Sequence, residues 1–501
     1  MLAIERFILG LMGTRRALLA IIFTWLAVFE GCSNVVSGEF NYKDALTKSL
    51  VFLEAQRSGK LPPNNRVPWR GDSALDDGKL ANVDLSGGYY DAGDNVKYGF
   101  PLAFTVTTLS WAAVYFKDEI QAAKEMDNVR DAIKWGTDYL LKCASRRDRL
   151  YVQVGDPEED HHCWVRPEKM KTKRTVLQIG DGTPGSEIAA ETAAAMASSS
   201  IVFRSTDRAY ARSLLNKAKL LFKMAKEHKG TYDGECPFYC SFSGYNDELL
   251  WAATWLYIAT KKPLYLKYIQ EEAISAYVNE FSWDLKYAGA QVLITRLLYE
   301  GVPKLDTFKY QADSFICSVH PESPYSQIKL TPGGVIHLRD GANTQYVTGT
   351  AMVFTFYGDI LEEHKQTITC GTKTFTSADL FKFAKGQVII NHMDYILGKN
   401  PEGRSIMVGF GNNPPKQAHH RGASVPMSAA NEEVTCPDSF IKWLQRDGPN
   451  PNELTGAILG GPDKNDHFDD KRTDSAATEP CTYVNSLAVG PLAKLAFIYN
   501  K

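Results

Sequence analysis

The stretch PLAFTVTTLSWAAVYF, residues 101–116, is apolar around almost its whole circumference if it forms a helix. Such a helix must be buried on all sides, because any exposed face would leave apolar side chains in water. A second stretch, EIAAETAAAMA at residues 187–197, is rich in Ala, which favours helix and lets neighbouring helices approach closely. The two stretches predict an all-α protein in which some helices are surrounded by others.

Helical spacing of apolar residues recurs along the chain, as at Leu46, Leu50 and Leu53. Strand signals are few and short, as at residues 150–154. Counting comparable segments predicts roughly twelve helices, enough for a barrel of six inner and six outer helices, although periodicity alone does not establish a barrel. The predicted helices cover residues 41–58, 101–117, 127–144, 187–204, 207–228, 246–261, 263–280, 286–301, 304–319, 343–362, 377–397 and 484–499.

Three long loops rich in Gly and Pro, residues 59–100, 145–186 and 398–483, separate groups of helices. Loops of this length in a compact protein are usually functional. Hydrophobic residues make up 44% of the 501 residues and charged residues 23%, as in an ordinary globular protein. With a net charge of -2 and no basic stripe, we expect no nucleic-acid partner.

The N-terminus resembles a targeting signal. Arg15 and Arg16 precede a short apolar run at residues 17–29, ALLAIIFTWLAVF. This length is typical of a signal peptide and short for a membrane span, with an uncleaved signal anchor as the alternative. Small residues at 37 and 38 offer a cleavage point, so we predict a signal peptide at residues 1–38 and one secreted catalytic domain at residues 39–501.

Nine cysteines occur, and Cys32 lies inside the predicted signal. An even number remains, which permits disulfides in a secreted chain, but their connectivity cannot be deduced from sequence and free, buried thiols are the alternative. The eight are Cys143, Cys163, Cys236, Cys240, Cys317, Cys370, Cys436 and Cys481.

Two segments carry candidate catalytic carboxylates. Asp91 and Asp94 lie three residues apart in GGYYDAGDNVKYGFP, residues 87–101, on a Gly-flanked turn ahead of a helix. Such a pair can orient one water, with one carboxylate as base, although a helix cap or a cation site has the same pattern. Glu479 stands among small and apolar residues before Pro480, where a carboxylic acid tends to keep its proton and suits a general acid. A capping or salt-bridged Glu is the alternative.

Histidines and a cluster of acidic residues raise the question of a metal. His419 and His420 are adjacent in SIMVGFGNNPPKQAHHRGAS, residues 405–424, so their side chains point in different directions. Zinc held by these and DHHCW at residues 160–164 lacks the usual ligand spacing. We therefore expect neither metal nor cofactor, and interpret His419 and Arg421 as groups that hydrogen-bond sugar hydroxyls. The acidic cluster of Asp463, Asp466, Asp469 and Asp470 is interpreted as a solvated loop in preference to a calcium site.

Taken together, eight segments resemble glycoside hydrolase family 9, and within it the secreted plant endo-β-1,4-glucanases. They occur in family order and cover nearly all of the chain after the signal. The segments are YYDAGDNVKYGFPLAFT, YVQVGDPEEDHHCW, PGSEIAAETAAA, DELLWAATWLY, SWDLKYAGAQVL, QYVTGTA, MVGFGNNPPKQAHHRGAS and PNPNELTGAILGGPDKNDHFDDKRTDSAATEPCTYVNS. The resemblance implies an (α/α)6 barrel and endohydrolysis of β-1,4-glucan with inversion.

The resemblance also implies roles for individual residues. Asp94 matches the general base, Asp91 the residue that holds the water, and Glu479 the general acid, with carboxyl groups about 6.5–9.5 Å apart to admit that water. His419 and Asp470 match further active-site positions. For Trp255 and Trp283, core packing is an equal alternative to stacking on sugar. The predicted substrate-binding residues are Arg421, His161, Trp164, Trp255, Trp283 and Tyr483.

The sequence departs from the family pattern at Ser475, Cys481 and Ala418, and in about five extra residues near 389–393. The three carboxylates are retained, which favours an active glucanase. The alternatives are a weakly active or inactive relative that only binds cell-wall glucan, and a hydrolase of a related β-glucan or glucomannan. We expect a monomer without a carbohydrate-binding module, acting on amorphous or soluble glucan.

Overall fold

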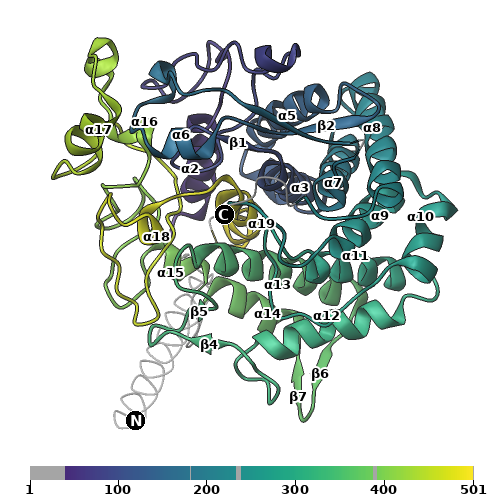
Figure 1. Ribbon diagram of the computed structural model, residues 1–501. Helices are drawn as coiled ribbons and strands as arrows, with labels where there is room; N and C mark the ends of the chain where they lie inside the picture. The colour runs from purple at the N-terminus through teal and green to yellow at the C-terminus, as the bar shows by residue number, and fades with distance from the viewer. Residues whose placement is uncertain (1–39, 181, 233–237, 387–391, 500–501) are drawn as a thin grey trace, which may run out of the picture.

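The computed structural model describes residues 40–180, 182–232, 238–386 and 392–499 (Figure 1). The predicted signal peptide, Cys236 and most of the extra residues near 389–393 lie outside these ranges. Within them, no helix is both long and apolar enough to cross a membrane.

Six helices form a closed inner ring, in which each contacts the next and the last contacts the first. Nearly every residue of these helices is buried, as the apolar stretch at 101–116 predicts. In Figure 1 these helices are arranged around a common centre. They are α3 (Gly99–Tyr115), α7 (Ser186–Phe203), α9 (Asn246–Thr260), α11 (Tyr287–Tyr299), α13 (Thr344–His364) and α19 (Thr482–Tyr499).

An outer helix packs against each member of the inner ring. The outer helices are amphipathic: in α8 the buried residues Leu214, Ala218 and Leu221 recur at helical spacing, while the opposite face is charged. In the order of their inner partners α19, α3, α7, α9, α11 and α13, they are α2 (Tyr42–Ala55), α5 (Met126–Cys143), α8 (Arg208–Glu227), α10 (Pro263–Lys267) continued by the π-helical η3 (Tyr268–Glu272), α12 (Asp306–Val319) and α14 (Ser377–Lys385). The predicted six-plus-six helical barrel is confirmed.

Two predicted helices are wrong in extent. The helix predicted at 263–280 ends at Glu272, because Ala273 is extended and the Gln291 side chain donates to the Ala276 carbonyl, 2.7 Å away. The helix predicted at 377–397 ends at Lys385, where Gly386 adopts a left-handed conformation with φ of 113°. Glycine ends helices in this way because it has no Cβ to clash. A separate helix, α15 (Met393–Leu397), follows.

The long loops contain short elements. A three-stranded antiparallel sheet of β1 (Lys97–Tyr98), β2 (Arg149–Val154) and β3 (Val176–Gly180) confirms the strand predicted at 150–154. Two hairpins pair β4 (Lys329–Leu330) with β5 (Ile336–His337), and β6 (Ile368–Cys370) with β7 (Lys373–Phe375). The short helices are η1 (Lys79–Ala81), α4 (Lys117–Ala122), α6 (Pro157–His161), η2 (Pro167–Lys169), α16 (Arg421–Ser424), η4 (Met427–Asn431), α17 (Cys436–Ser439), η5 (Phe440–Leu444) and α18 (Ser475–Thr478).

Disulfides and ion pairs fix these loops to one another. Cys163 is bonded to Cys436, which joins the second and third long loops, and Cys317 is bonded to Cys370. Cys143 and Cys481 are buried free thiols. The sequence left both outcomes open.

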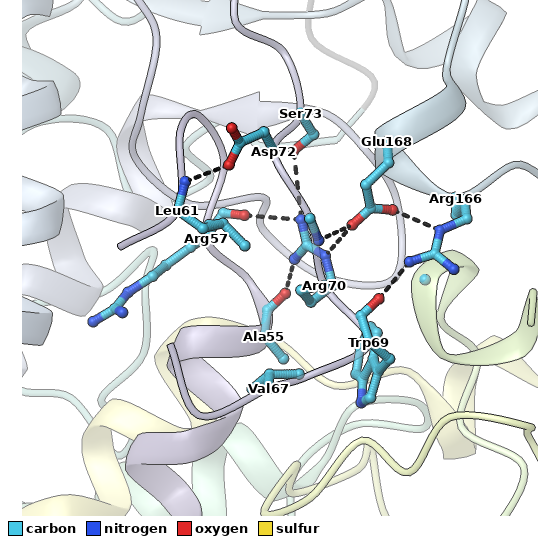
Figure 2. A network of polar contacts seen from close by, with 12 residues as sticks. Ala55, Arg57, Leu61, Val67, Trp69, Arg70, Asp72, Ser73, Arg166 and Glu168 are labelled. Atoms are coloured by element: carbon cyan, nitrogen blue, oxygen red, sulfur yellow. Dashed lines mark hydrogen bonds and ion pairs between the residues drawn. The ribbon is translucent and has the colours of Figure 1, made fainter. Parts of the chain in front are cut away.

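A buried ionic network joins the first long loop to the second (Figure 2). Arg70 and Arg166 each contact the Glu168 carboxylate at 2.7 Å. Arg166 also donates to the Trp69 carbonyl, and Arg70 to the Arg57 carbonyl at 3.0 Å. Burial acts to raise the pKa of Glu168, but the two guanidinium groups outweigh it and lower that pKa to about 2. Glu168 therefore stays charged and holds the two loops together.

Candidate active site

The Asp91–Asp94 turn lies between the end of α2 and the start of α3. Gln56 fixes its backbone by two hydrogen bonds, because Tyr90 N donates to the Gln56 carbonyl at 2.9 Å and Gln56 Nε2 donates to the Ala92 carbonyl at 2.7 Å. Gly93 is required at the apex: a Cβ there would lie 2.1 Å from the His419 carbonyl oxygen and 2.9 Å from Glu479 Oε1. The turn can thus press directly against both other segments of the site.

Glu479 follows α18, and Gly93 N donates to its Oε1 at 3.0 Å. Thr482 N donates to the Asp91 carbonyl at 3.0 Å, a second contact between the two segments. Burial and then the charge of Asp94 raise the pKa of Glu479 to about 7. Residues 386 positions apart are therefore brought together, and Glu479 keeps its proton in mildly acidic water.

Asp91 is buried more deeply than its partner. Its Oδ2 accepts a hydrogen bond from the Tyr239 hydroxyl, and its Oδ1 has no hydrogen-bond partner within the described residues. Burial, with Asp94 and Glu479 nearby, raises the pKa of Asp91 well above its usual value. Sequence reasoning missed Tyr239, because a tyrosine in the connection between α8 and α9 belongs to no motif that signals catalysis.

Asp94 faces the helix α6. His161 Nε2 lies 3.4 Å from Asp94 Oδ2. Burial acts to lower the pKa of His161, but the hydrogen bond to Asp94 outweighs it and the net shift is upward. Asp94, Asp160 and His161 offer ligand atoms within 4.8 Å of one another, a geometry open to a small cation. Asp160 already faces a protein cation, because Arg421 Nη2 lies 3.2 Å from its Oδ2.

Arg421 is buried behind the carboxylates, and its guanidinium bonds to protein. It donates to the backbone carbonyls of Gly93 at 3.2 Å, Asp160 at 3.0 Å and Cys163 at 3.2 Å. These contacts tie the Asp91–Asp94 turn to α6 and the residues after it. Arg421 therefore positions the site from behind, whereas the sequence predicted a contact with substrate.

Trp164 and His419 form a packed pair behind the same turn. Their rings lie 4.7 Å apart edge to face, and the Trp164 indole donates to Ser424 Oγ at 2.7 Å. His419 Nδ1 lies 2.7 Å from the Arg472 carbonyl, and burial, the largest influence, lowers the pKa of His419 to about 4. The ring of Trp164 is buried, so it supports His419 and does not offer the predicted platform for sugar.

The remaining predicted substrate-binding aromatics differ in position. Trp283 is half-buried beside Tyr239, with ring centroids 4.9 Å apart, and Tyr483 lies buried at 6.4 Å from the same ring. Trp255 is 0% exposed and packs at 5.6 Å from Trp251 in the barrel core. Of the two alternatives for Trp255, this burial favours core packing over stacking on sugar, because the ring has no exposed face to offer a ligand.

The acidic residues near 463–470 mostly bond to protein. Asp470 accepts from the backbone N–H groups of Lys416 at 2.8 Å and Gln417 at 3.0 Å, so it orients the chain leading to His419 and stands behind the site. Asp466 accepts from the Tyr395 hydroxyl at 2.6 Å. Asp463 accepts from two backbone N–H groups of its own turn, and Asp469 pairs with the next-but-one lysine.

The three departures from the family pattern lie in different surroundings. Ser475 is exposed at the start of α18, Ala418 is buried before His419, and Cys481 is a buried thiol two residues after Glu479. Burial, and then the charges of Asp91 and Glu479, raise the pKa of the Cys481 thiol well above its usual value. Cys481 therefore stays an uncharged thiol beside the carboxylates.

The family model for glycosyl hydrolase family 9 matches residues 42–492, which include all three carboxylates and the barrel as far as the middle of α19. The chain belongs to glycosyl hydrolase family 9. This family 9 chain is 71% identical over 462 residues to Endoglucanase 16 of Arabidopsis thaliana, covering 92% of this chain and 94% of that protein. It is 64% identical to Endoglucanase 8 of Oryza sativa subsp. japonica, covering 92% of each chain.

Solved structures of family 9 agree with this assignment. The endoglucanase from the termite Nasutitermes takasagoensis superposes with a TM-score of 0.79 at 35% identity, covering 92% of this chain and 100% of that one. The cellulase Cel9M of C. cellulolyticum, in complex with cellobiose, gives a TM-score of 0.78 at 30% identity with the same coverage. The family resemblance predicted from eight sequence segments is confirmed.

Proposed function

We propose that this family 9 enzyme hydrolyses β-1,4-glucosidic bonds within glucan chains, with Asp94 as general base, Asp91 as the residue that holds the water and Glu479 as general acid. The activity follows from family membership and from endoglucanase relatives at 71% and 64% identity. The residue roles rest on the position of Glu479, which the Gly93 N–H holds against the Asp91–Asp94 turn at 3.0 Å; burial and Asp94 also raise its pKa to about 7, which leaves it able to donate a proton.

The Asp pair is assigned by charge sharing. Burial and the charge of Asp94 raise the pKa of Asp91, which supports Asp91 as the carboxyl of the pair that keeps a proton. Asp94, whose Oδ2 lies 3.4 Å from His161 Nε2, is then left as the base. Asp91 fixes the water, and the Tyr239 hydroxyl fixes Asp91.

The reaction is a single displacement. Asp94 takes a proton from the water, the water oxygen bonds to the anomeric carbon, and the bond from that carbon to the glycosidic oxygen breaks. Glu479 delivers its proton to the leaving oxygen, so one new hydroxyl forms on each product. Attack from the face opposite the leaving group converts a β bond into an α product.

The product anomer tests this mechanism directly. We expect proton NMR during hydrolysis of a short cello-oligosaccharide to show the α-anomer of the new reducing end before mutarotation. Early appearance of the β-anomer indicates a retaining enzyme and contradicts the assignment of Asp94 as base.

A glucan-binding relative with little activity is the second candidate, favoured by the departures at Ser475 and Cys481. Reducing ends released from carboxymethylcellulose and from mannan distinguish the two candidates. Release from carboxymethylcellulose supports the glucanase. Retention on cellulose without release from either polymer supports the binding protein, and release from mannan alone indicates a different hydrolase.

We also propose that the enzyme is secreted to the cell wall as a monomer, with residues 1–38 removed and residues 39–501 acting as one catalytic domain. The disulfides Cys163–Cys436 and Cys317–Cys370 support an oxidising compartment. Expression in a secreting plant cell, N-terminal sequencing of the exported protein and its mass by light scattering test these points. An N-terminus at residue 1 contradicts cleavage.

A further inference from the structure

Tyr98 ends β1 and precedes α3, four residues after Asp94. Its side chain is only 5% exposed, and its hydroxyl is buried without a hydrogen-bond partner within the described residues. Burying a hydroxyl without a partner costs stability, because its bonds to water are lost and not replaced. A phenylalanine at this position would avoid the cost, so the hydroxyl needs an explanation.

Ring contacts link Tyr98 to the neighbours of both proposed catalytic aspartates. Its ring lies 4.9 Å from that of Tyr239, whose hydroxyl donates to Asp91. It also lies 6.2 Å from that of Phe238, whose ring is 4.8 Å from His161, the partner of Asp94. Tyr98 is therefore held by the same residues that contact the proposed base and its neighbour.

Asp94 has weak hydrogen bonds on both oxygens. Val96 N donates to Oδ1 at 3.3 Å, and His161 Nε2 lies 3.4 Å from Oδ2. Both distances are at the long end for such bonds, so a further donor has room to act. Burial, and then the charge of Asp94 ahead of the other nearby carboxylates, raises the pKa of Tyr98. The phenol therefore keeps its proton and can act toward the Asp94 carboxylate only as a donor.

We propose that the Tyr98 hydroxyl donates a hydrogen bond to the Asp94 carboxylate in the substrate complex and so positions the base. This inference rests on the proposed function, because it takes Asp94 to be the base. Catalytic hydrogen bonds are often long or unformed in the free enzyme and tighten when substrate binds. The hydroxyl is unpaired in the free enzyme, which lowers stability, because its hydrogen bond forms only when substrate is bound.

The test compares Tyr98→Phe with Tyr89→Phe. Tyr89 is a buried tyrosine of the same loop whose hydroxyl is already satisfied, because it donates to the Ala132 carbonyl at 2.7 Å. For Tyr98→Phe we expect an equal or higher Tm, a kcat lower by about tenfold, and an acidic limb of the pH profile moved to higher pH. The limb moves because a donor to the anion lowers a carboxyl pKa, and its loss raises that pKa. Tyr89→Phe should lower Tm and leave the acidic limb in place.

Two results overturn the inference. If Tyr98→Phe raises Tm without changing kcat or the acidic limb, the hydroxyl is an unpaired group with no part in the reaction. If kcat falls but the limb does not move, the hydroxyl contacts the sugar and not Asp94. The variant Asp94→Asn distinguishes failure of this inference from failure of the proposed function. Hydrolysis retained in Asp94→Asn shows that Asp94 is not the base, whatever the effect of Tyr98→Phe.

Discussion

Two clusters of buried carboxylates lie in this barrel, and they are built in opposite ways. In the core, Lys286 is fully buried with its Nζ 2.9 Å from Glu248 and 3.8 Å from Glu191, while its backbone N–H donates to Asp247 at 2.8 Å. Burial acts to lower the pKa of Lys286, but the three carboxylates outweigh it and raise that pKa. This cluster has its cation at its centre.

Among the described residues, no lysine or arginine forms an ion pair with Asp91, Asp94 or Glu479 of the proposed catalytic cluster. Arg421 is bonded to Asp160 and to backbone carbonyls, and the closest partners of the reacting carboxylates are a tyrosine hydroxyl, a histidine and backbone N–H groups. Buried carboxylates can therefore have two roles. Where a lysine neutralises them they stabilise the fold, and where repulsion and burial raise their pKa they can hold a proton for a reaction.

The largest loss of activity is expected when the proposed acid is replaced. We expect Glu479→Gln to lower kcat by about 10²–10⁴-fold, because the glycosidic oxygen then leaves without a proton. Binding of a cello-oligosaccharide, measured by calorimetry, should be retained. Glu187→Gln is the matched control, since burial also raises the pKa of Glu187 to about 7 but its carboxylate accepts from Tyr232 N at 2.7 Å. Equal loss in both variants would falsify the role of Glu479.

Replacing Lys286 tests whether the cation of the core cluster stabilises the fold. We expect Lys286→Met to lower the free energy of unfolding by about 3–5 kcal/mol, because it leaves buried carboxylates without their partner. Denaturant unfolding followed by fluorescence measures this. Lys134→Met removes an exposed lysine from its pair with Asp138 and should cost less than about 1 kcal/mol. Similar values for both variants contradict a structural role for Lys286.

Tyr239 offers a smaller change on the catalytic side. We expect Tyr239→Phe to lower kcat by roughly 2- to 10-fold, since a hydrogen bond between uncharged groups contributes about 0.5–1.5 kcal/mol. Steady-state kinetics on carboxymethylcellulose measure the change. The exposed Tyr277 provides the control variant Tyr277→Phe, which should leave kcat unchanged. An unaltered kcat in Tyr239→Phe removes Tyr239 from the site.

The last prediction concerns the loss of activity at high pH, the basic limb of the pH profile. Glu479 donates only when protonated, so kcat/KM should fall to about half its maximum near pH 7 and decline tenfold per pH unit above it. The same raised pKa means that the native state binds this proton more tightly than the unfolded chain. Its contribution to stability is therefore complete below the ordinary pKa of 4.5 and is lost as pH rises through about 7. An activity plateau extending above pH 8 contradicts this ionisation.

The ten helices whose bounds agree with the sequence-based prediction are those with strong patterns, apolar all round as in α3 or striped as in α8. Burial is encoded locally there, because side chains at helical spacing share one face. Prediction failed where ends depended on distant partners, as at Glu272, beyond which the Gln291 side chain binds the backbone. A contact of that kind leaves no local pattern.

In the candidate site, too, some features follow from the local sequence and others depend on distant residues. Periodicity in the sequence was enough for the helical class, and its motifs were enough for the family, the barrel that the family implies and the three carboxylates to consider. Only the tertiary structure decided that Arg421 bonds inward, that Trp255 is core, and that Tyr239 touches Asp91. The raised pKa of Glu479, on which its proposed role as acid rests, also comes from the fold, because it depends on burial and on Asp94. The Gly93 N–H, likewise from the other end of the chain, orients its carboxylate.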